Sequence, residues 1–311
     1  MQPLIWDRRP TGLRAPVMIC AFEGWNDAGD AASTAVSFMS RALRAERFAH
    51  IDTEEFYDFQ ANRPRIRLAG VDRHREIDWP SVEIYSASVP EAPRDLVLVQ
   101  GIEPSLRWRS FGALICELAE AIGVQLVITL GALLADVPHT RPVAMTGFAS
   151  DSALMRRLGT HNSSDYEGPT GIVGVLHNMT AAAGLPSMSL WASIPHYVAA
   201  APSPKAALAL VQRLQELVGV TVDVAELEDA TVSYERQVGL AVSGNPEVQA
   251  FVERLEREDD EEIEDDEDED DDADQLPLLL DDLPSGDILA SEFQRFLRQR
   301  REDEPPQDAG S

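Results

Sequence analysis

Short apolar runs that alternate with helix-like segments constrain the fold of this chain most strongly. Residues 17–22, 96–99 and 126–130 are almost continuously apolar and contain β-branched members. Runs of this kind are typical of strands that are buried on both faces of a sheet. Residues 187–194 are expected to form a further strand. Because helices are expected between these strands, the pattern predicts a doubly wound, mostly parallel α/β sheet with helices on both faces.

Each expected strand is followed by a segment in which apolar or small residues recur at helical spacing. The first helix, over residues 28–43, follows a turn in which Asn26, Asp27 or Asp30 can cap it. Further helices are expected at residues 111–122, 171–184, 206–217 and, with one solvated side, about 224–257. Residues 48–59, 65–68 and 82–87 are expected to form edge strands or a hairpin.

The negative charge of the chain is concentrated near its C-terminal end. Of the formal net charge of −28, residues 258–311 carry −19, from 23 acids and 4 bases, which leaves −9 for residues 1–257. Binding to nucleic acid without sequence preference and binding to anionic membranes both rely on clustered Lys and Arg. The body has no basic run, and its single lysine, Lys205, does not lie in a Gly-Lys-Ser/Thr loop. We therefore expect no nucleic-acid partner, no membrane partner and no P-loop.

The cysteines and the apolar stretches favour a cytoplasmic location. Cys20 and Cys116 lie in apolar runs and are expected to be buried free thiols, because a structural metal site needs four clustered ligands. The first ten residues lack the apolar core of a signal peptide. The longest apolar stretch, residues 124–137, is too short to span a bilayer.

Residues 1–257 are expected to form a single α/β domain, followed by three segments of different character. Between residues 258 and 274, 15 of 17 residues are acidic, so residues 258–284 are expected to be a disordered linker. Residues 285–301 are expected to form an amphipathic docking helix with arginines at its end, and residues 302–311 a disordered end. The apolar stripe of this helix, which is the candidate surface for docking a partner, consists of Ile288, Leu289, Phe293, Phe296 and Leu297.

Polar side chains follow the expected strands at the edge where their carboxyl ends meet, which is the usual place for a ligand in such a sheet. The candidates for binding a ligand there are Asp27, Glu103, His139, Arg141, Glu167, Thr170 and His196. Carboxylates, imidazoles and a guanidinium could together serve hydrolysis or phosphorolysis. The same residues could equally fix turns and tie loops together. We expect no metal and no cofactor, and the chain contains no Gly-x-Ser-x-Gly, His-Glu-x-x-His or Gly-x-Gly-x-x-Gly motif.

Four blocks together resemble the proteasome assembly chaperone 2 family, in its bacterial branch. These blocks are residues 24–29 (GWNDAG), 137–142 (VPHTRP), 167–174 (EGPTGIVG) and 194–197 (IPHY). The resemblance implies a phosphorylase/hydrolase-like fold, similar to that of purine nucleoside phosphorylases, and a tendency to form homo-oligomers. It also implies protein partners, because the eukaryotic members help to assemble the proteasome α-ring without known catalytic activity.

Two classes of function are therefore compatible with the sequence. The first is a non-catalytic protein-interaction or assembly-chaperone-like protein, which the acidic tail and the missing catalytic motifs favour. The second is an enzyme or sensor for a nucleoside-like or other small anionic ligand, which the polar residues at the strand ends favour. A crevice filled by its own side chains would indicate the first class, and an open pocket that holds Glu103, Arg141 and Glu167 would indicate the second.

Overall fold

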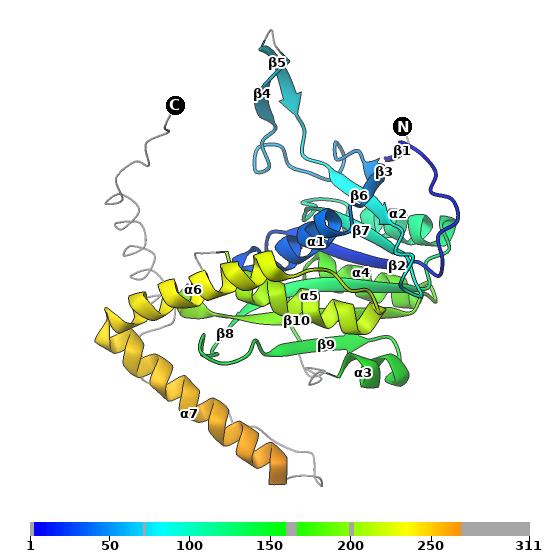
Figure 1. Cartoon of the computed structure of the whole chain (residues 1–311). Coiled ribbons are helices and arrows are strands. Elements are labelled where there is room, and N and C mark those ends of the chain that lie inside the picture. The colour runs from blue at the N-terminus through cyan, green and yellow to red at the C-terminus, as the bar shows by residue number, and fades with distance from the viewer. Residues whose placement is uncertain (1–2, 71–72, 160–166, 199–201, 269–311) are drawn as a thin grey trace.

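An eight-stranded mixed sheet forms the centre of the protein in the computed structural model (Figure 1). The structure describes residues 3–70, 73–159, 167–198 and 202–268. The strand order is β1-β3-β6-β7-β2-β8-β10-β9. The four central strands run parallel, and they are β7 (Leu96–Ile102), β2 (Val17–Glu23), β8 (Leu126–Ala135) and β10 (Ser187–Pro195). The predicted α/β class is confirmed, and all four central strands contain the runs expected from the sequence.

Antiparallel strands flank this parallel centre on both sides. On one side lie β6 (Val82–Ala87), β3 (Glu46–Ile51) and β1 (Leu4–Trp6), and on the other lies β9 (Met145–Ala149). The expectation that residues 82–87 form an edge strand or part of a hairpin is thus only partly met, since β6 is an inner strand paired with both β3 and β7. The strand β9 was not expected, because four of its five residues are only partly buried and the fifth is a glycine.

Helices cover both faces of the sheet, as the alternation of side chains along buried strands requires. The helices α1 (Ala31–Ala42) and α5 (Pro204–Val218) pack on one face, and α2 (Trp108–Ala121) and α4 (Ile172–Ala182) on the other. Along β2, Ile19 belongs to the first core, whereas Met18 and Cys20 belong to the second. The remaining short helices are η1 (Ala28–Asp30), α3 (Ser152–Leu158) and η2 (His196–Val198). No helix in the described ranges is long and apolar enough to cross a membrane.

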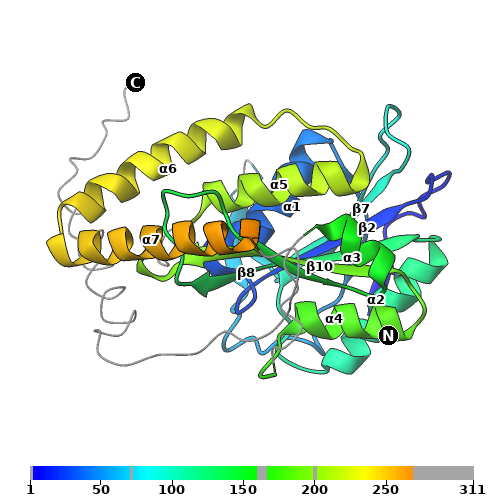
Figure 2. The same ribbon diagram turned by 90° about the horizontal axis from the view of Figure 1, so that it is seen from below.

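The last expected helix, over about 224–257, is two helices in the structure. They are α6 (Ala225–Ser243) and α7 (Pro246–Asp268), which fold back on each other beside the body (Figures 1 and 2). The break has a local cause, because Pro246 disfavours helical backbone at the preceding residue. Asn245 instead caps α7, its side-chain oxygen accepting hydrogen bonds from the backbone N–H groups of Glu247 and Val248.

The helix α7 continues into the acidic run that was expected to lack structure. Its described backbone extends to Asp268. Arg141, from the loop after β8, forms ion pairs with Asp259 and Asp260 and so compensates part of the negative charge of this run. The rest of the acidic linker, the docking helix expected over residues 285–301 and the end of the chain lie outside the described residues, so these segments stay predictions.

A second, two-stranded sheet projects from the body (Figure 1). It consists of β4 (Arg65–Ala69) and β5 (His74–Asp78), which pair antiparallel. The sequence predicted its first strand, but not its separation from the main sheet. Three of its apolar residues, Ile66, Leu68 and Ile77, are exposed.

Candidate functional site

The carboxyl ends of the parallel strands meet at one edge of the sheet, where the seven candidate residues were expected to converge. Glu103 directly follows β7, His139 and Arg141 lie in the loop after β8, and His196 directly follows β10. The structure separates the candidates into a first group beside the start of α4, which contains Glu103, Glu167 and Thr170, and a second group beside α5 and α7, which contains His139 and Arg141. Asp27 lies at the start of α1, and His196 contacts Asp136 in the loop after β8.

Glu103 belongs to the first group, and its carboxylate ties three segments together. Its Oε1 atom accepts a hydrogen bond from the Asn26 side-chain amide at 2.7 Å and another from the Ile172 backbone N–H at 2.8 Å. Ile172 is the first residue of α4, so the carboxylate compensates an unpaired N–H group at the positive end of the helix. Asn26 lies in the GWNDAG block, but its sequence position indicated only a helix cap and not this contact.

Gly171 allows this close approach of the turn to the helix. A Cβ atom at this position would lie 2.2–2.6 Å from the atoms of the Asn26 amide group. Thr170 and Glu167, which precede it, are exposed. Thr170 packs against Gly174 in the first turn of α4, where an added Cβ would lie 2.2 Å from its hydroxyl oxygen. The three-residue glycine spacing therefore serves close packing at least at Gly171 and Gly174.

Asp27 also compensates a helix start. Asp27 is 4% exposed, and its carboxylate accepts hydrogen bonds from the backbone N–H groups of Ala32, at 2.7 Å, and Ser33, at 3.3 Å to each oxygen, in the first turn of α1. Burial disfavours the charged form and raises the pKa of Asp27 to about 6, although the hydrogen bonds oppose this shift. Because both oxygens point at the helix backbone, Asp27 acts as a cap in this structure.

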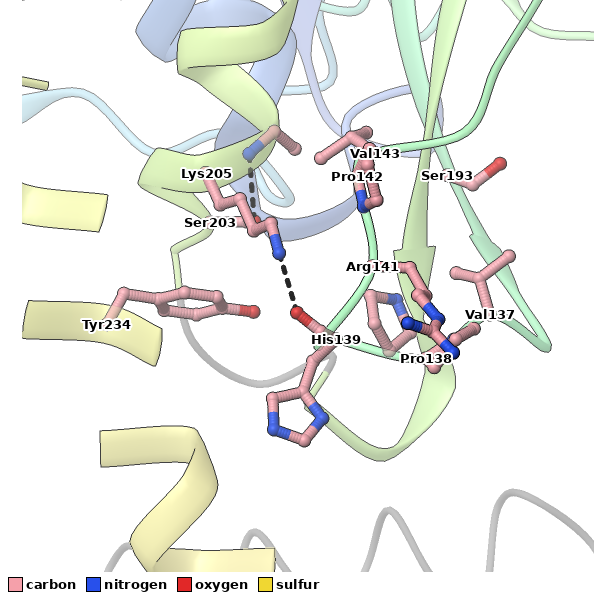
Figure 3. Close-up of a pocket in the computed structure, with 12 residues that line it drawn as sticks. Val137, Pro138, His139, Arg141, Pro142, Val143, Ser193, Ser203, Lys205 and Tyr234 are labelled. Atoms are coloured by element: carbon pink, nitrogen blue, oxygen red, sulfur yellow. Dashed lines mark hydrogen bonds between the residues drawn. The ribbon is translucent and has the colours of Figure 1, made fainter. Parts of the chain in front are cut away.

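His139 belongs to the second group and is held in place by Tyr197 and Lys205. Its backbone N–H donates to the Tyr197 hydroxyl oxygen at 2.7 Å, and its Nδ1 atom lies 2.9 Å from the same oxygen. Lys205 donates to the His139 carbonyl oxygen at 2.7 Å (Figure 3). Lys205 also forms an ion pair with Glu235. Burial, together with the nearby charge of Lys205, lowers the pKa of His139. Neutral His139 can therefore accept the Tyr197 hydroxyl proton at Nδ1.

Arg141 and His196 are paired with acidic residues. The Arg141 guanidinium donates to both carboxylate oxygens of Asp260, at 2.6 and 2.7 Å, in the acidic part of α7. The neighbouring Thr140 donates from its hydroxyl to Glu256 on the same helix. His196 Nδ1 lies 3.1 Å from an oxygen of Asp136. Arg141, the candidate that could best bind an anion, thus holds α7 against the loop after β8.

The space enclosed at this edge is small. A cavity of about 20 Å³ lies among residues that include His139, Arg141, Ser203, Lys205 and Tyr234, which Figure 3 shows with the other residues that line it. This volume holds about one water molecule. A pocket for a drug-sized ligand takes roughly 300–1,000 Å³. Neither Glu103 nor Glu167 lines the cavity. The crevice beside His139 is therefore filled by side chains of the protein itself.

A wider, open hollow of about 350 Å³ lies along α5, between Met145 and Thr231. Its lining includes Lys205, Arg213 and Glu216 together with Pro142, Val143 and Leu208. None of the seven candidate residues lines it. Among the described residues, no group of three or more His, Cys, Asp or Glu side chains is placed to hold a metal ion. Cys20 is buried and Cys116 partly buried, both as free thiols.

Residues 21–241 match the family model of the PAC2 family. A PAC2 family protein from Streptomyces avermitilis is 49% identical, over 76% of this chain and 99% of that one, with a TM-score of 0.71. A proteasome-assembly chaperone homologue from Mycobacterium tuberculosis is 41% identical over the same shares, with a TM-score of 0.70.

PbaB, an archaeal proteasome activator from Pyrococcus furiosus, has the same fold. It is 17% identical, over 76% of this chain and 98% of that one, with a TM-score of 0.62. The comparison with curated proteins found no match.

Proposed function

Because the chain belongs to the PAC2 family, we propose that it is a non-catalytic, assembly-chaperone-like protein that acts by binding other proteins. The observation that carries this conclusion is the filled crevice beside His139 and Arg141, which leaves room for about one water molecule. The family match agrees with the resemblance of the four sequence blocks.

The contacts of the candidate residues support a structural role for the polar edge. Glu103 and Asp27 satisfy backbone N–H groups at the starts of α4 and α1. His139 is bonded to Tyr197, and Arg141 to α7. A general acid or base must be within hydrogen-bond reach of a bound substrate, and these groups are directed at the protein instead. An enzyme or sensor for a nucleoside-like or other anionic ligand is therefore not supported.

The partner that we propose is a component of a proteasome. What supports it is the naming of two similar proteins, one as a proteasome-assembly chaperone homologue and the other as a proteasome activator. We also propose that the protein forms homo-oligomers, that it acts in the cytoplasm and that its architecture is phosphorylase-like. The resemblance of the four sequence blocks supports the first and the third of these proposals, and the short apolar stretches and the two cysteines support the second.

Reconstitution tests the proposed function. Separately purified α and β proteasome subunits of the source organism would be mixed with and without the protein, and the assembly intermediates followed by native electrophoresis and mass spectrometry. We expect the protein to bind an α-containing intermediate, to change its rate of maturation and to be absent from the finished particle. Unchanged intermediates and rates at equimolar protein would refute the proposal.

A thermal-shift screen with nucleosides, nucleotides and phosphate provides the opposite test. We expect no stabilisation by any of them at millimolar concentration. A shift that the wild type shows and Arg141→Ala loses would point to the small-ligand function instead.

A further inference from the structure

The hairpin of β4 and β5 presents apolar side chains on one face. Its register pairs Ile66 with Ile77 and Leu68 with Arg75, so these four residues share a face, because directly opposed residues of an antiparallel pair point to the same side. Ile66, Leu68 and Ile77 are 64%, 51% and 56% exposed. The opposite face carries an ion pair between Arg67 and Glu76. This apolar face is unpartnered among the described residues.

The hairpin also has open edges. Within the described chain, β4 pairs only with β5, and Figure 1 shows the two strands standing clear of the eight-stranded sheet. An unpaired strand edge offers a row of backbone N–H and C=O groups that can add a further strand. The two strands differ in charge, because β4 carries Arg65 and Arg67 and no acid, whereas β5 carries Glu76 and Asp78 with one arginine, Arg75.

The charge of the hairpin is opposite to that of the rest of the protein. Residues 63–79 contain five arginines and three acids, a net charge of +2, while the remaining residues carry −30. The arginines were overlooked in the sequence because they alternate with other residues and do not form a run. Arg65, Arg67 and Arg75 are exposed in the structure. An acidic segment is therefore the complementary partner for the β4 edge.

The size of the hairpin restricts the kind of partner. Five residues span about 17 Å and two strands about 10 Å, so one face offers only roughly 170 Å². A stable contact between two globular proteins buries about 800 Å² on each partner. Two hairpins packed face to face would thus be too small a contact, and two β4 edges brought together would place arginines against arginines. A β4 edge against the β5 edge of a second copy would match in charge, and sedimentation tests this arrangement below. An extended segment avoids both limits, because main-chain hydrogen bonds supply its affinity.

The acidic helix of the same molecule does not meet the hairpin. Figure 1 shows the hairpin and the described end of α7 at opposite ends of the molecule. We propose that the free edge of β4 binds an extended segment of another protein in which acidic and apolar residues alternate. The acidic residues would lie opposite Arg65 and Arg67, and the apolar residues opposite Ile66 and Leu68. This inference concerns a surface apart from the strand-end edge and stands whether or not the reconstitution with proteasome subunits succeeds.

Peptide binding to the full chain tests the proposal. The probe is a fluorescein-labelled ten-residue peptide of alternating glutamate and valine, followed by fluorescence anisotropy. Its controls are an alternating lysine–valine peptide and a peptide with five glutamates followed by five valines. We expect the glutamate–valine peptide to bind at least ten-fold more tightly than either control. Absence of binding up to 1 mM peptide, or equal binding of the controls, would overturn the proposal.

Two further comparisons separate strand addition at β4 from general charge attraction. Arg65→Glu/Arg67→Glu should weaken binding at least ten-fold, while the matched variant Arg109→Glu/Arg236→Glu, with the same change of charge elsewhere on the surface, should bind like the wild type. In an added strand, only every second backbone N–H group of the peptide faces β4. N-methylation of the residues whose N–H groups face β4 should therefore abolish binding, and N-methylation of the other residues should not affect it. Equal effects of the two variants, or of the two N-methylated peptides, would overturn the proposal.

Sedimentation velocity of the same proteins checks whether a second copy is the partner. We expect Arg65→Glu/Arg67→Glu to leave the oligomeric state of the wild type unchanged. Self-association that this variant alone abolishes would show that the edge binds a second copy, and the proposal would be wrong.

Discussion

Replacing Glu103 by alanine should weaken the junction between β7, the GWNDAG turn and α4. The change removes the acceptor of two hydrogen bonds, from the Asn26 amide and from the Ile172 backbone N–H. It also removes a negative charge from the start of α4. The groups left behind are partly buried, so solvent would replace these contacts only incompletely.

The expected loss is on the order of 3 kcal/mol. A hydrogen bond to a charged group contributes about 1.5–3 kcal/mol, and we take the lower end for each bond because the site is only partly buried. A charge at a helix end adds about 0.3–1 kcal/mol. For a domain of this size, each kcal/mol corresponds to about 2–4 °C in melting temperature. Glu103→Ala should therefore melt roughly 6–12 °C below the wild type.

Two further variants give this prediction its controls. Glu103→Gln retains an acceptor oxygen but loses the charge, so it should cost only about 1 kcal/mol. Glu120→Ala removes an exposed carboxylate from α2 and should stay within about 0.5 kcal/mol of the wild type. Calorimetry and urea titration at neutral pH would measure all three. A Glu103→Ala loss below about 1 kcal/mol, or one no larger than that of Glu103→Gln, would refute the reasoning.

Three other predictions follow from the structure. The pKa of Asp27 rises from 3.8 to about 6 on folding, so the folded state binds this proton more tightly. As the pH rises from about 4 to about 6, the free energy of unfolding of the wild type should fall by on the order of 2–3 kcal/mol relative to that of Asp27→Asn. Urea titrations in which the difference between the two proteins stays constant would contradict this. The pKa of His139 is lowered on folding, so the NMR titration of its ring should have a midpoint below 6.5. The contribution of neutral His139 to stability should be lost as the pH falls through this midpoint. A midpoint above 6.5 would show that the His139 ring does not stay buried. Ending the chain after Asp268 should leave the melting temperature unchanged, whereas ending it after Arg257 removes Asp259 and Asp260 and should speed amide exchange in the rest of α7 several-fold. Equal exchange in the two shortened chains would mean that Arg141 does not hold this helix.

The central part of the fold could be predicted because a strand that is buried on both faces of a sheet is an almost continuous run of apolar residues. All residues from 17 to 22, and the four apolar residues among positions 126–130, face one of two cores. Elements that are less buried do not have such apolar runs. The strand β9 is short and partly buried, and the break between α6 and α7 was missed although Pro246 follows directly after Asn245.

The candidate site was predictable in its position and not in its contacts. The sequence alone placed Glu103, His139 and His196 after strands of one parallel sheet, since parallel strands end at the same edge. It could not show that Arg141 contacts α7, because the two residues of the pair with Asp260 are 119 positions apart. It also could not show that Glu103 accepts a hydrogen bond from the Asn26 side chain, because loop geometry decides which side chains meet.

The sequence by itself determined the α/β class, the family and the concentration of acids near the C-terminal end, because each depends on residue types in order along the chain. Only the tertiary structure decided that the strand-end crevice is filled, that the β4–β5 hairpin stands free and that Arg141 compensates part of the acidic run. These properties depend on distances between segments that are remote in the chain. The same polar residues could have lined a pocket or capped helices, and the packing of loops against helix ends selected the second.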